Sequence, residues 1–433
     1  MLTTEDNEIL CRVGPGTPMG NVLRRYWHPF LLSEELPKND GAPLRIRLLG
    51  EDLIAFRDSE GKVGLLDERC PHRGASLFFG INQDCGIMCI YHGWKFDVNG
   101  QCVDMPSDLP DSNFKDKVRT TSYPCIESAG AVWAYMGPAE HQPPSPDFMF
   151  NRVDPDCVIA TRTPIYCNWV QSLEGNIDSS HLGTLHRYLD DFKIELTEPD
   201  QPGYPDLTQS IYQRAHYRYA NVEVQDTSYG FRLIAIRPTE AGNQHLRINC
   251  QVMPYVTFIA APRGSGGPLM HVPVDDENCF RMSFSARPGR PFTAAEREQR
   301  KRQAMVMDPN DPSMRLLRAD NDYMIDREAQ KTKLISGIWS GGEQDYCVTE
   351  SMGPIYDRTN EHLYSADAAI IRLRQMLLSA ARGLLEGDQP PALDPSIPFH
   401  MIRSEEIIIG PDDDAWEVAA DAGESAKRGE RLR

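Results

Sequence analysis

The sequence predicts an α+β chain, in which a small all-β domain precedes a larger domain that combines helices with a sheet. Three observations support this division. Short apolar runs joined by turn residues fill residues 26–140. A proline-rich segment, which indicates a linker, lies near residues 138–147. Beyond it, helical stretches at 168–186, 293–305 and 366–386 occur together with strand-like segments.

The first part of the chain has the pattern of a β domain. Residues 1–25 are expected to form an N-terminal arm with a short helix and a Gly/Pro-rich turn. Residues 44–48 alternate apolar and arginine side chains, as a half-buried strand does. Two hairpins are predicted, and their paired segments are 53–56 with 63–66, and 94–97 with 101–103.

The second part is expected to form a mixed domain over residues 150–410. Its strand-like segments are 229–236, 245–252 and 256–260. The last segment, residues 411–433, is charged and poor in apolar residues, so we expect a partly disordered tail.

Composition excludes several classes of protein. A chain of 433 residues suffices for two or three domains, and its net charge of −18 argues against nucleic acid or an anionic membrane as partners. Its 11 scattered cysteines fit free thiols and metal ligands better than a disulfide framework. Residues 1–9 lack the apolar stretch of a signal peptide, and no run is long enough to span a membrane. We therefore expect a soluble, cytoplasmic protein.

Two short loops each combine one cysteine with one histidine. They are Cys70-Pro71-His72 and Cys89-Ile90-Tyr91-His92, and residues 73–88 separate them. This mixed set, with one Cys and one His from each loop, is typical of a Rieske [2Fe–2S] cluster, whose potential is raised by the two His ligands. The alternative is a zinc site, although zinc favours Cys pairs and His pairs. Cys85 is a competing thiol that we expect to be a small buried residue instead.

A second polar cluster lies in the helical stretch 168–186. Gln171, Glu174, Asp178 and His181 are spaced 3, 4 and 3 residues apart, which would place them on one helix face. His181 and His186 are five residues apart, so both can reach one metal only if the helix ends or distorts. Gly183 lies between them and could supply that break. The alternative is two ordinary helix histidines.

Two histidines and one carboxylate form the facial triad of non-haem Fe(II) oxygenases, which leaves positions open for O₂ and substrate. The candidates for the carboxylate are Asp345, Asp357 and Asp367. Asp345 lies where a glycine-rich loop leads into a helix, whereas Asp367 lies at a predicted helix N-cap.

Arginines in the strand-like region near residues 229–252 are candidate substrate ligands. Arg232, Arg237 and Arg247 could bind a substrate carboxylate in a bidentate manner. The alternative for each is ordinary surface charge. We carry Arg247 and Arg232 forward as candidates.

These motifs together resemble the α subunits of Rieske-type aromatic-ring-hydroxylating oxygenases, of the phthalate 4,5-dioxygenase type. The resemblance covers most of the chain. It is carried by residues 12–20, 24–27, 70–74, 89–94, 168–186, 344–345, 350–353, 357–359 and 361–363. It implies a small all-β Rieske domain followed by a catalytic domain with the helix-grip fold, an antiparallel sheet with helices.

The resemblance also implies a role for each site residue. Cys70 and Cys89 would bind one iron of the cluster, and His72 and His92 the other. A mononuclear Fe(II) would be bound by His181, His186 and Asp345. Asp178 would carry electrons to this iron from the Rieske cluster of a neighbouring subunit in a homotrimer.

The resemblance implies hydroxylation of an aromatic, carboxylated substrate of the phthalate or benzoate type, with O₂ and electrons from a separate NADH-dependent reductase. No G-x-G-x-x-G motif opens a helix in this chain, so we expect no NAD site. Two alternatives remain open. One is a mono-oxygenase or O-demethylase of an aryl ether on the same scaffold, and the other is a Rieske electron-transfer protein without oxygenase activity.

Overall fold

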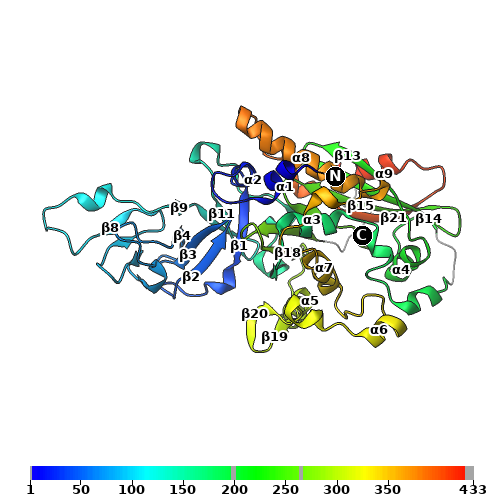
Figure 1. The fold of residues 1–433 in the computed structure, drawn as a ribbon, viewed down its shortest axis with the longest axis horizontal. Helices are drawn as coiled ribbons and strands as arrows, with labels where there is room; N and C mark the ends of the chain where they lie inside the picture. The colour runs from blue at the N-terminus through cyan, green and yellow to red at the C-terminus, as the bar shows by residue number, and fades with distance from the viewer. Residues whose placement is uncertain (1, 197–200, 263–266, 425–433) are drawn as a thin grey trace. The chain divides into compact units, whose positions relative to one another are not determined.

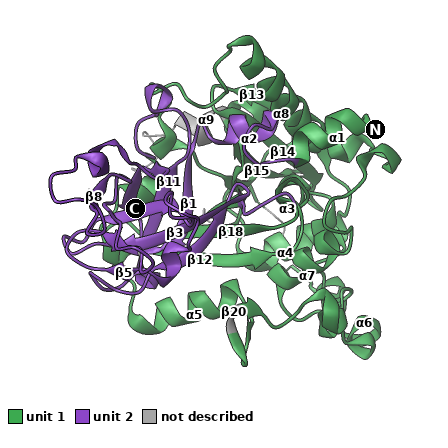
Figure 2. Ribbon diagram, turned by 60° about the vertical axis from the view of Figure 1, so that its left-hand side comes forward, with its two compact units in different colours: residues 1–11, 147–271, 277–433 green, residues 12–146, 272–276 purple. Residues whose placement is uncertain are grey.

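The computed structural model describes residues 2–196, 201–262 and 267–424, and it divides into two compact units. Figure 2 colours them separately. The smaller unit comprises residues 12–146 and 272–276. The larger unit comprises residues 1–11, 147–271 and 277–433, so the first helix of the chain belongs to it.

The smaller unit is built from short antiparallel strands. Its sheets have the orders β1-β11-β10, β2-β3-β4-β9 and β5-β6-β7-β8. The strands are β1 (Trp27–Leu32), β2 (Leu44–Leu48), β3 (Glu51–Arg57), β4 (Val63–Asp67), β5 (Ile81–Asn82), β6 (Ile87–Met88), β7 (Lys95–Phe96), β8 (Cys102–Asp104), β9 (Ser122–Tyr123), β10 (Cys125–Ser128) and β11 (Ala131–Tyr135). One short helix, α2 (Pro18–Leu23), precedes them. The all-β prediction for this part of the chain is confirmed.

Both predicted hairpins are present in the smaller unit. Strand β3 pairs with β4, and β7 pairs with β8. Apolar side chains of the two four-stranded sheets are fully buried in one core, among them Phe56, Leu66 and Phe96. Cys70 and Cys89 belong to the same buried cluster, so the hydrophobic core extends up to the two cysteine loops.

The larger unit is organised around an eight-stranded antiparallel sheet. Its order is β12-β18-β17-β16-β15-β14-β13, and β21 also pairs with β15. The strands are β12 (Val158–Ile165), β13 (Asn221–Thr227), β14 (Gly230–Pro238), β15 (Gln244–Val252), β16 (Val256–Phe258), β17 (Pro268–Pro273), β18 (Cys279–Ala286) and β21 (Glu405–Ile409). A separate small hairpin consists of β19 (Met307–Asp308) and β20 (Asp311–Arg315). The predicted antiparallel sheet with helices is confirmed.

Eight α-helices of the described chain belong to the larger unit. They are α1 (Thr4–Cys11), α3 (Trp169–Ile177), α4 (Leu207–His216), α5 (Ala294–Ala304), α6 (Arg327–Thr332), α7 (Gly341–Glu350), α8 (Ala368–Glu386) and α9 (Ala415–Glu424). Helix α8 lies along β13, and α3 packs against α7 (Figure 1). None of the helices in the described ranges is long and apolar enough to cross a bilayer.

The secondary structure differs from the prediction in two places. The helices predicted at 293–305 and 366–386 are present as α5 and α8. The helix predicted over 168–186 is α3, but it ends at Ile177, so the prediction was wrong beyond that residue. In the predicted tail, α9 forms over Ala415–Glu424, while residues 425–433 lie outside the described part of the chain.

Candidate metal centres

The two cysteine loops of the smaller unit have the same backbone hydrogen bonds. The amide of Cys70 donates to the carbonyl of Ala75 at 2.9 Å, and the amide of Cys89 donates to that of Trp94 at 2.8 Å. In each loop a glycine amide then donates back to the cysteine carbonyl, from Gly74 and from Gly93. Both glycines have positive φ, +74° and +78°, which favours glycine at the tip. The loops thus present their side chains in similar ways.

The four side chains of these loops come together as the spacing predicts. The Cys70 and Cys89 side chains are buried at 2% exposure, and the rings of His72 and His92 are 4.4 Å apart. Burial and the neighbouring Cys89 raise the pKa of Cys70 to about 11. Because buried thiols ionise only when a positive centre compensates them, this donor set suits a bound iron cluster.

A third thiol, that of Cys102, lies in the same core, whereas the sequence singled out Cys85 as the competing thiol. The prediction that Cys85 is a small buried residue was wrong, because Cys85 is only half-buried, and its amide donates to the hydroxyl of Ser59 at 3.0 Å. Cys102 instead packs in the buried cluster that contains Cys70. Its thiol donates to the carbonyl of Asp104 at 3.4 Å, and burial raises its pKa. Only the three-dimensional pairing of β7 with β8 places Cys102 there.

In the larger unit, the local conformation around Asp178 ends helix α3. One carboxylate oxygen of Asp178 accepts hydrogen bonds from the amide and the hydroxyl of Ser180, both at 2.6 Å. Such a turn competes with the helical hydrogen bonds. A 3₁₀ turn at His181–Gly183 follows. The break that two histidines at this spacing require therefore occurs before His181, and not at Gly183 as the sequence suggested.

The three predicted triad residues converge. His181, His186 and Asp345 each offer one ligand atom, and these atoms lie within 4.8 Å of one another. The Nε2 atom of His186 is 3.0 Å from Oδ1 of Asp345, and that of His181 is 3.8 Å from it. Asp345 lies on α7, which α3 contacts directly. Two imidazoles and one carboxylate at this separation match the donor set of a non-haem iron site.

The other candidate carboxylates have local partners. Asp357 accepts from the amide of Thr359 at 3.0 Å, and Asp367 accepts from that of Tyr364 at 2.9 Å. Among the described residues, Asp345 is the carboxylate that the structure groups with both histidines.

Each histidine has a partner on its other ring nitrogen. The Nδ1 atom of His181 is 3.2 Å from Oδ2 of Asp178, and that of His186 is 2.7 Å from Oε1 of Gln344. Burial works to raise the pKa of Asp178, but its hydrogen bonds with His181 and Ser180 outweigh this effect and lower it. Such partners orient metal-binding imidazoles and raise their basicity. The sequence did not indicate that Gln344 is the partner of His186.

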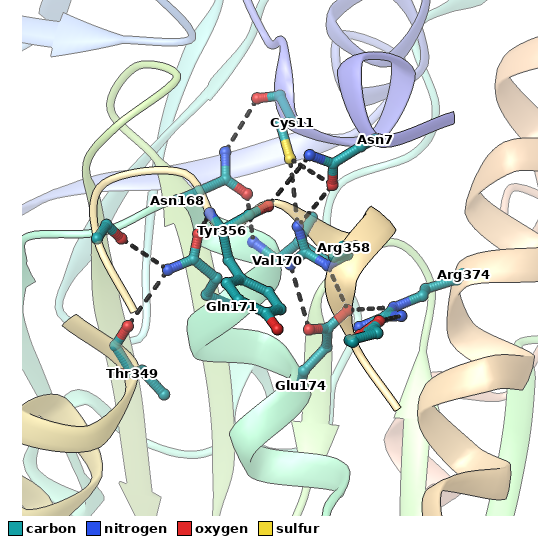
Figure 3. Close-up of polar contacts among 12 residues, drawn as sticks. Asn7, Cys11, Asn168, Val170, Gln171, Glu174, Thr349, Tyr356, Arg358 and Arg374 are labelled. Carbon is teal, nitrogen blue, oxygen red and sulfur yellow. Dashed lines mark hydrogen bonds and ion pairs between the residues drawn. The ribbon is translucent and has the colours of Figure 1, made fainter. Parts of the chain in front are cut away.

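Helix α3 is held by polar contacts with residues from distant parts of the chain, among them Arg358 and Arg374 (Figure 3). The side chain of Asn168 caps the helix by accepting from the amide of Val170 at 3.1 Å. Glu174 forms ion pairs with Arg358 at 3.2 Å and with Arg374 at 2.6 Å. The two guanidinium groups lower the pKa of Glu174 although burial opposes this. The end of the helix, and so Asp178, is fixed in place.

The arginines predicted to bind substrate have partners within the protein. Arg247 pairs with Glu406 at 2.5 Å and donates to the carbonyl of Ala260. Arg232 donates to the hydroxyl of Tyr229 and to the carbonyl of Ala419. A substrate role for Arg247 and Arg232 stays a prediction. The third candidate, Arg237, donates to the carbonyl of Ser179, directly after Asp178.

One arginine that the sequence did not single out lies close to the metal-binding residues. Burial opposes a higher pKa of His186, but Asp345 and Gln344 raise it, and the charge of Arg214, on α4, only partly offsets that rise. Burial and the charge of Arg247 lower the pKa of Arg214 itself to about 10. Its Nε donates to the carbonyl of Ser210, and among the described residues no hydrogen bond engages its terminal nitrogens. Arg214 lies in the helix segment LTQSIYQRAH, and nothing in that segment indicates a position near the metal-binding residues.

A groove of about 1020 Å³ opens beside the second site. The residues that line it include Ser180, His181, Thr184, Arg218, Tyr219, Arg237 and Tyr364. His181 is thus accessible from the surface of the larger unit.

Comparison with known proteins agrees with both sites. Residues 26–124 match the Rieske [2Fe–2S] domain, and residues 134–430 match the family described as LigXa C-terminal domain like. The chain is 38% identical to the phthalate 4,5-dioxygenase oxygenase subunit of Pseudomonas putida, over 90% of this chain and 88% of that protein. It is 36% identical to the 3-chlorobenzoate-3,4-dioxygenase oxygenase subunit of Comamonas testosteroni, over 97% and 98%.

More distant relatives share the architecture. The 5,5′-dehydrodivanillate O-demethylase oxygenase subunit of Sphingobium sp. (strain NBRC 103272 / SYK-6) is 30% identical over 95% of this chain and 89% of that protein. The oxygenase in the reduced complex with ferredoxin of carbazole 1,9a-dioxygenase is similar in fold, with a TM-score of 0.55 at 20% identity, over 88% of this chain and 96% of that one.

A Cys₂His₂ cradle in one unit and a two-histidine, one-carboxylate set in the other define an iron-dependent oxygenase that receives electrons through an iron–sulfur cluster. The chain belongs to the Rieske-type oxygenase α subunits, of the phthalate 4,5-dioxygenase type. It is an oxidoreductase whose cofactors are a Rieske [2Fe–2S] cluster and a mononuclear iron.

Proposed function

We propose that this protein hydroxylates an aromatic carboxylate at the iron held by His181, His186 and Asp345. The convergence of these three side chains, with Nε2 of His186 3.0 Å from Asp345, is the observation that carries the proposal. In the smaller unit, Cys70 and Cys89 would bind one iron of the cluster, and His72 and His92 the other. When bound, the cluster supplies single electrons and the mononuclear iron supplies the reduction of O₂.

The assignment of Asp178 follows from its position. Its Oδ2 faces Nδ1 of His181 at 3.2 Å, and its other oxygen is fixed by Ser180. Asp178 would hold the proton on Nδ1 of His181 and connect this ligand with the Rieske histidine of a neighbouring subunit. The groove beside His181 supports access from outside the larger unit. We therefore propose a homo-oligomer, with a homotrimer as its repeating ring.

Positive charge near His186 supports a carboxylated substrate. Arg214, Arg237 and Arg247 influence one another electrostatically, and Glu406 is the carboxylate that pairs with Arg247. The terminal nitrogens of Arg214 have no hydrogen bond among the described residues, so we propose that they bind a substrate carboxylate, which a guanidinium does in a bidentate manner. Arg247 would then orient this cationic region rather than bind the substrate by itself. Two relatives are named for phthalate and chlorobenzoate, which carry such a group.

The proposed partners are O₂ and an electron donor. We propose an NADH-dependent reductase as the donor, because the sequence shows no nucleotide-binding motif of its own. A cytoplasmic location is part of the same proposal, and the 11 cysteines, all free in the structure, support it.

One experiment distinguishes this reading from the alternative. Purified protein with a surrogate reductase, NADH and O₂ is supplied with phthalate, 3-chlorobenzoate and a methoxylated benzoate, and products are identified by mass. Dioxygenation adds two oxygen atoms and two hydrogens to the ring, whereas O-demethylation releases formaldehyde and water. Formaldehyde as the main product would favour the O-demethylase alternative, which the 30% identical relative supports. Electron uptake without any product would instead indicate an electron carrier.

A further inference from the structure

The amide of Gln344 is oriented by a contact that leaves it only one possible arrangement. Its Nε2 atom donates to the carbonyl oxygen of Ile338 at 2.7 Å. Because a carbonyl oxygen only accepts, the nitrogen of the amide must face Ile338 and the oxygen must face His186. Gln344 is 2% exposed, so its amide is shielded from bulk solvent.

This orientation determines the tautomer of His186. Its Nδ1 lies 2.7 Å from Oε1 of Gln344, and an amide oxygen can only accept, so Nδ1 must carry the hydrogen. The lone pair is then on Nε2, the atom that lies 3.0 Å from Asp345. The imidazole is thus held with its metal-binding nitrogen toward the proposed iron site.

The helix that carries Gln344 is fixed from its opposite side. Arg315, which is fully buried, donates to Glu343 at 2.7 Å and also forms an ion pair with Glu350. The hydroxyl of Tyr323 donates to Glu350 at 2.8 Å. Helix α7 therefore presents Gln344 and its neighbour Asp345 to the two histidines from a rigid backbone.

The two histidines differ in the charge of their partners. His181 faces the carboxylate of Asp178, whereas His186 faces a neutral amide. We propose that Gln344 is a positioning residue that fixes the hydrogen of His186 on Nδ1 and points Nε2 toward the proposed iron site, and thereby sets the affinity of the site for a divalent metal. The proposal rests on the triad assigned under the proposed function.

The test measures metal binding rather than turnover. The full chain is prepared with its [2Fe–2S] cluster loaded and its mononuclear site emptied by a chelator, and it is then titrated with Co(II) by calorimetry. Gln344→Leu keeps the volume but removes the acceptor, and we expect the Kd for Co(II) to rise about 10–100-fold. Gln344→Glu restores an acceptor for Nδ1 and should stay within about threefold of the wild type or bind more tightly.

A matched control separates positioning from general stability. Gln251 is also fully buried, accepts from Thr257 at 2.7 Å and donates to the carbonyl of Val252, but it has no hydrogen bond with a histidine among the described residues. Gln251→Leu should leave the Kd unchanged. If the Leu variant of Gln344 does not accumulate as folded protein with the visible absorption of the cluster, Gln344→Met replaces it.

Two results would overturn the proposal. One is Co(II) affinity within twofold of the wild type for the Leu or Met variant. The other is an equal loss of affinity in Gln344→Glu, which would reduce Gln344 to an anchor for Ile338. A wild-type chain that binds Co(II) through His186 but forms no oxygenated product would refute the proposed function and leave this inference standing.

Discussion

Glu406 is the side chain on which the charge balance beside the second metal site depends. Strand β21 pairs with β15 and places Glu406 opposite Arg247. The fully buried carboxylate accepts from Nη1 of Arg247 at 2.5 Å and from Nε2 of His245 at 2.8 Å. Burial alone would raise the pKa of Glu406, but Arg247 and His245 outweigh it and lower the pKa to about 2. Glu406→Gln removes the charge and keeps the shape.

The size of the effect follows from this pKa. One pKa unit corresponds to about 1.4 kcal/mol, so lowering the value from 4.5 to about 2 adds about 3 kcal/mol to the free energy of unfolding at neutral pH. Since the folded-state pKa is depressed, this stability is fully present above 4.5 and is lost as the pH falls through about 2. Loss of one partner of a buried ion pair costs about 3–5 kcal/mol, which agrees with this value.

The assay is urea unfolding of the full chain, followed by circular dichroism, with the visible absorption of the cluster as a separate report on the smaller unit. At pH 7, Glu406→Gln should lower the free energy of unfolding by about 3 kcal/mol, and at pH 3.5 the difference should shrink to about 2 kcal/mol. The matched control is Glu405→Gln, on the same strand, whose carboxylate accepts from the hydroxyl of Tyr204. A difference below about 1 kcal/mol at pH 7, or one that does not change with pH, would refute the reasoning.

Three further substitutions test the site. Asp178→Asn should keep metal in both sites, by iron analysis, yet lower product formation about 100-fold, and wild-type turnover would contradict the bridging role. Arg214→Leu should raise KM for an aromatic carboxylate about 10–100-fold and leave KM for the corresponding amide unchanged, because one charged hydrogen-bonding group is lost. An equal change for both substrates would exclude a carboxylate contact. Glu174→Gln leaves Arg358 and Arg374 facing each other and should lower the free energy of unfolding by about 3–5 kcal/mol in denaturant titrations, and a loss below about 1 kcal/mol would contradict this.

The parts of the site that the sequence predicts are those set by neighbouring residues. The Cys70 and Cys89 loops could be predicted because each holds its ligands within a few residues, and the glycines after them indicate tight turns. Asp345 is one of three candidate carboxylates in the sequence, and the family resemblance, rather than a local pattern, selects it. The end of α3 at Ile177 was missed, because the apolar periodicity continues while the side chain of Asp178 forms a turn with Ser180.

The partners of the arginines could not be predicted, because they are far apart in the sequence. Arg247 meets Glu406 only through the pairing of β15 with β21, and the hydrogen bond joins residues 159 positions apart. A pattern of arginines along a strand shows which residues share a face, but not which of them is already neutralised. For the same reason the sequence did not single out Arg214, on α4, as an arginine whose charge acts on His186.

The two metal centres therefore differ in how far apart in the sequence their ligands lie. The cluster ligands lie within one short stretch of the smaller unit, whereas the triad requires α3 and α7, which are more than 150 residues apart and are each held by buried arginines. The N-terminal helix takes part in this support, since Asn7 accepts from Arg358 at 3.1 Å and the carbonyl of Cys11 accepts from Asn168 at 3.0 Å (Figure 3). Because Arg358 also pairs with Glu174, α1 braces the helix that ends at Asp178. The first residues of the chain thus support the oxygenase site rather than the cluster that follows them in the sequence.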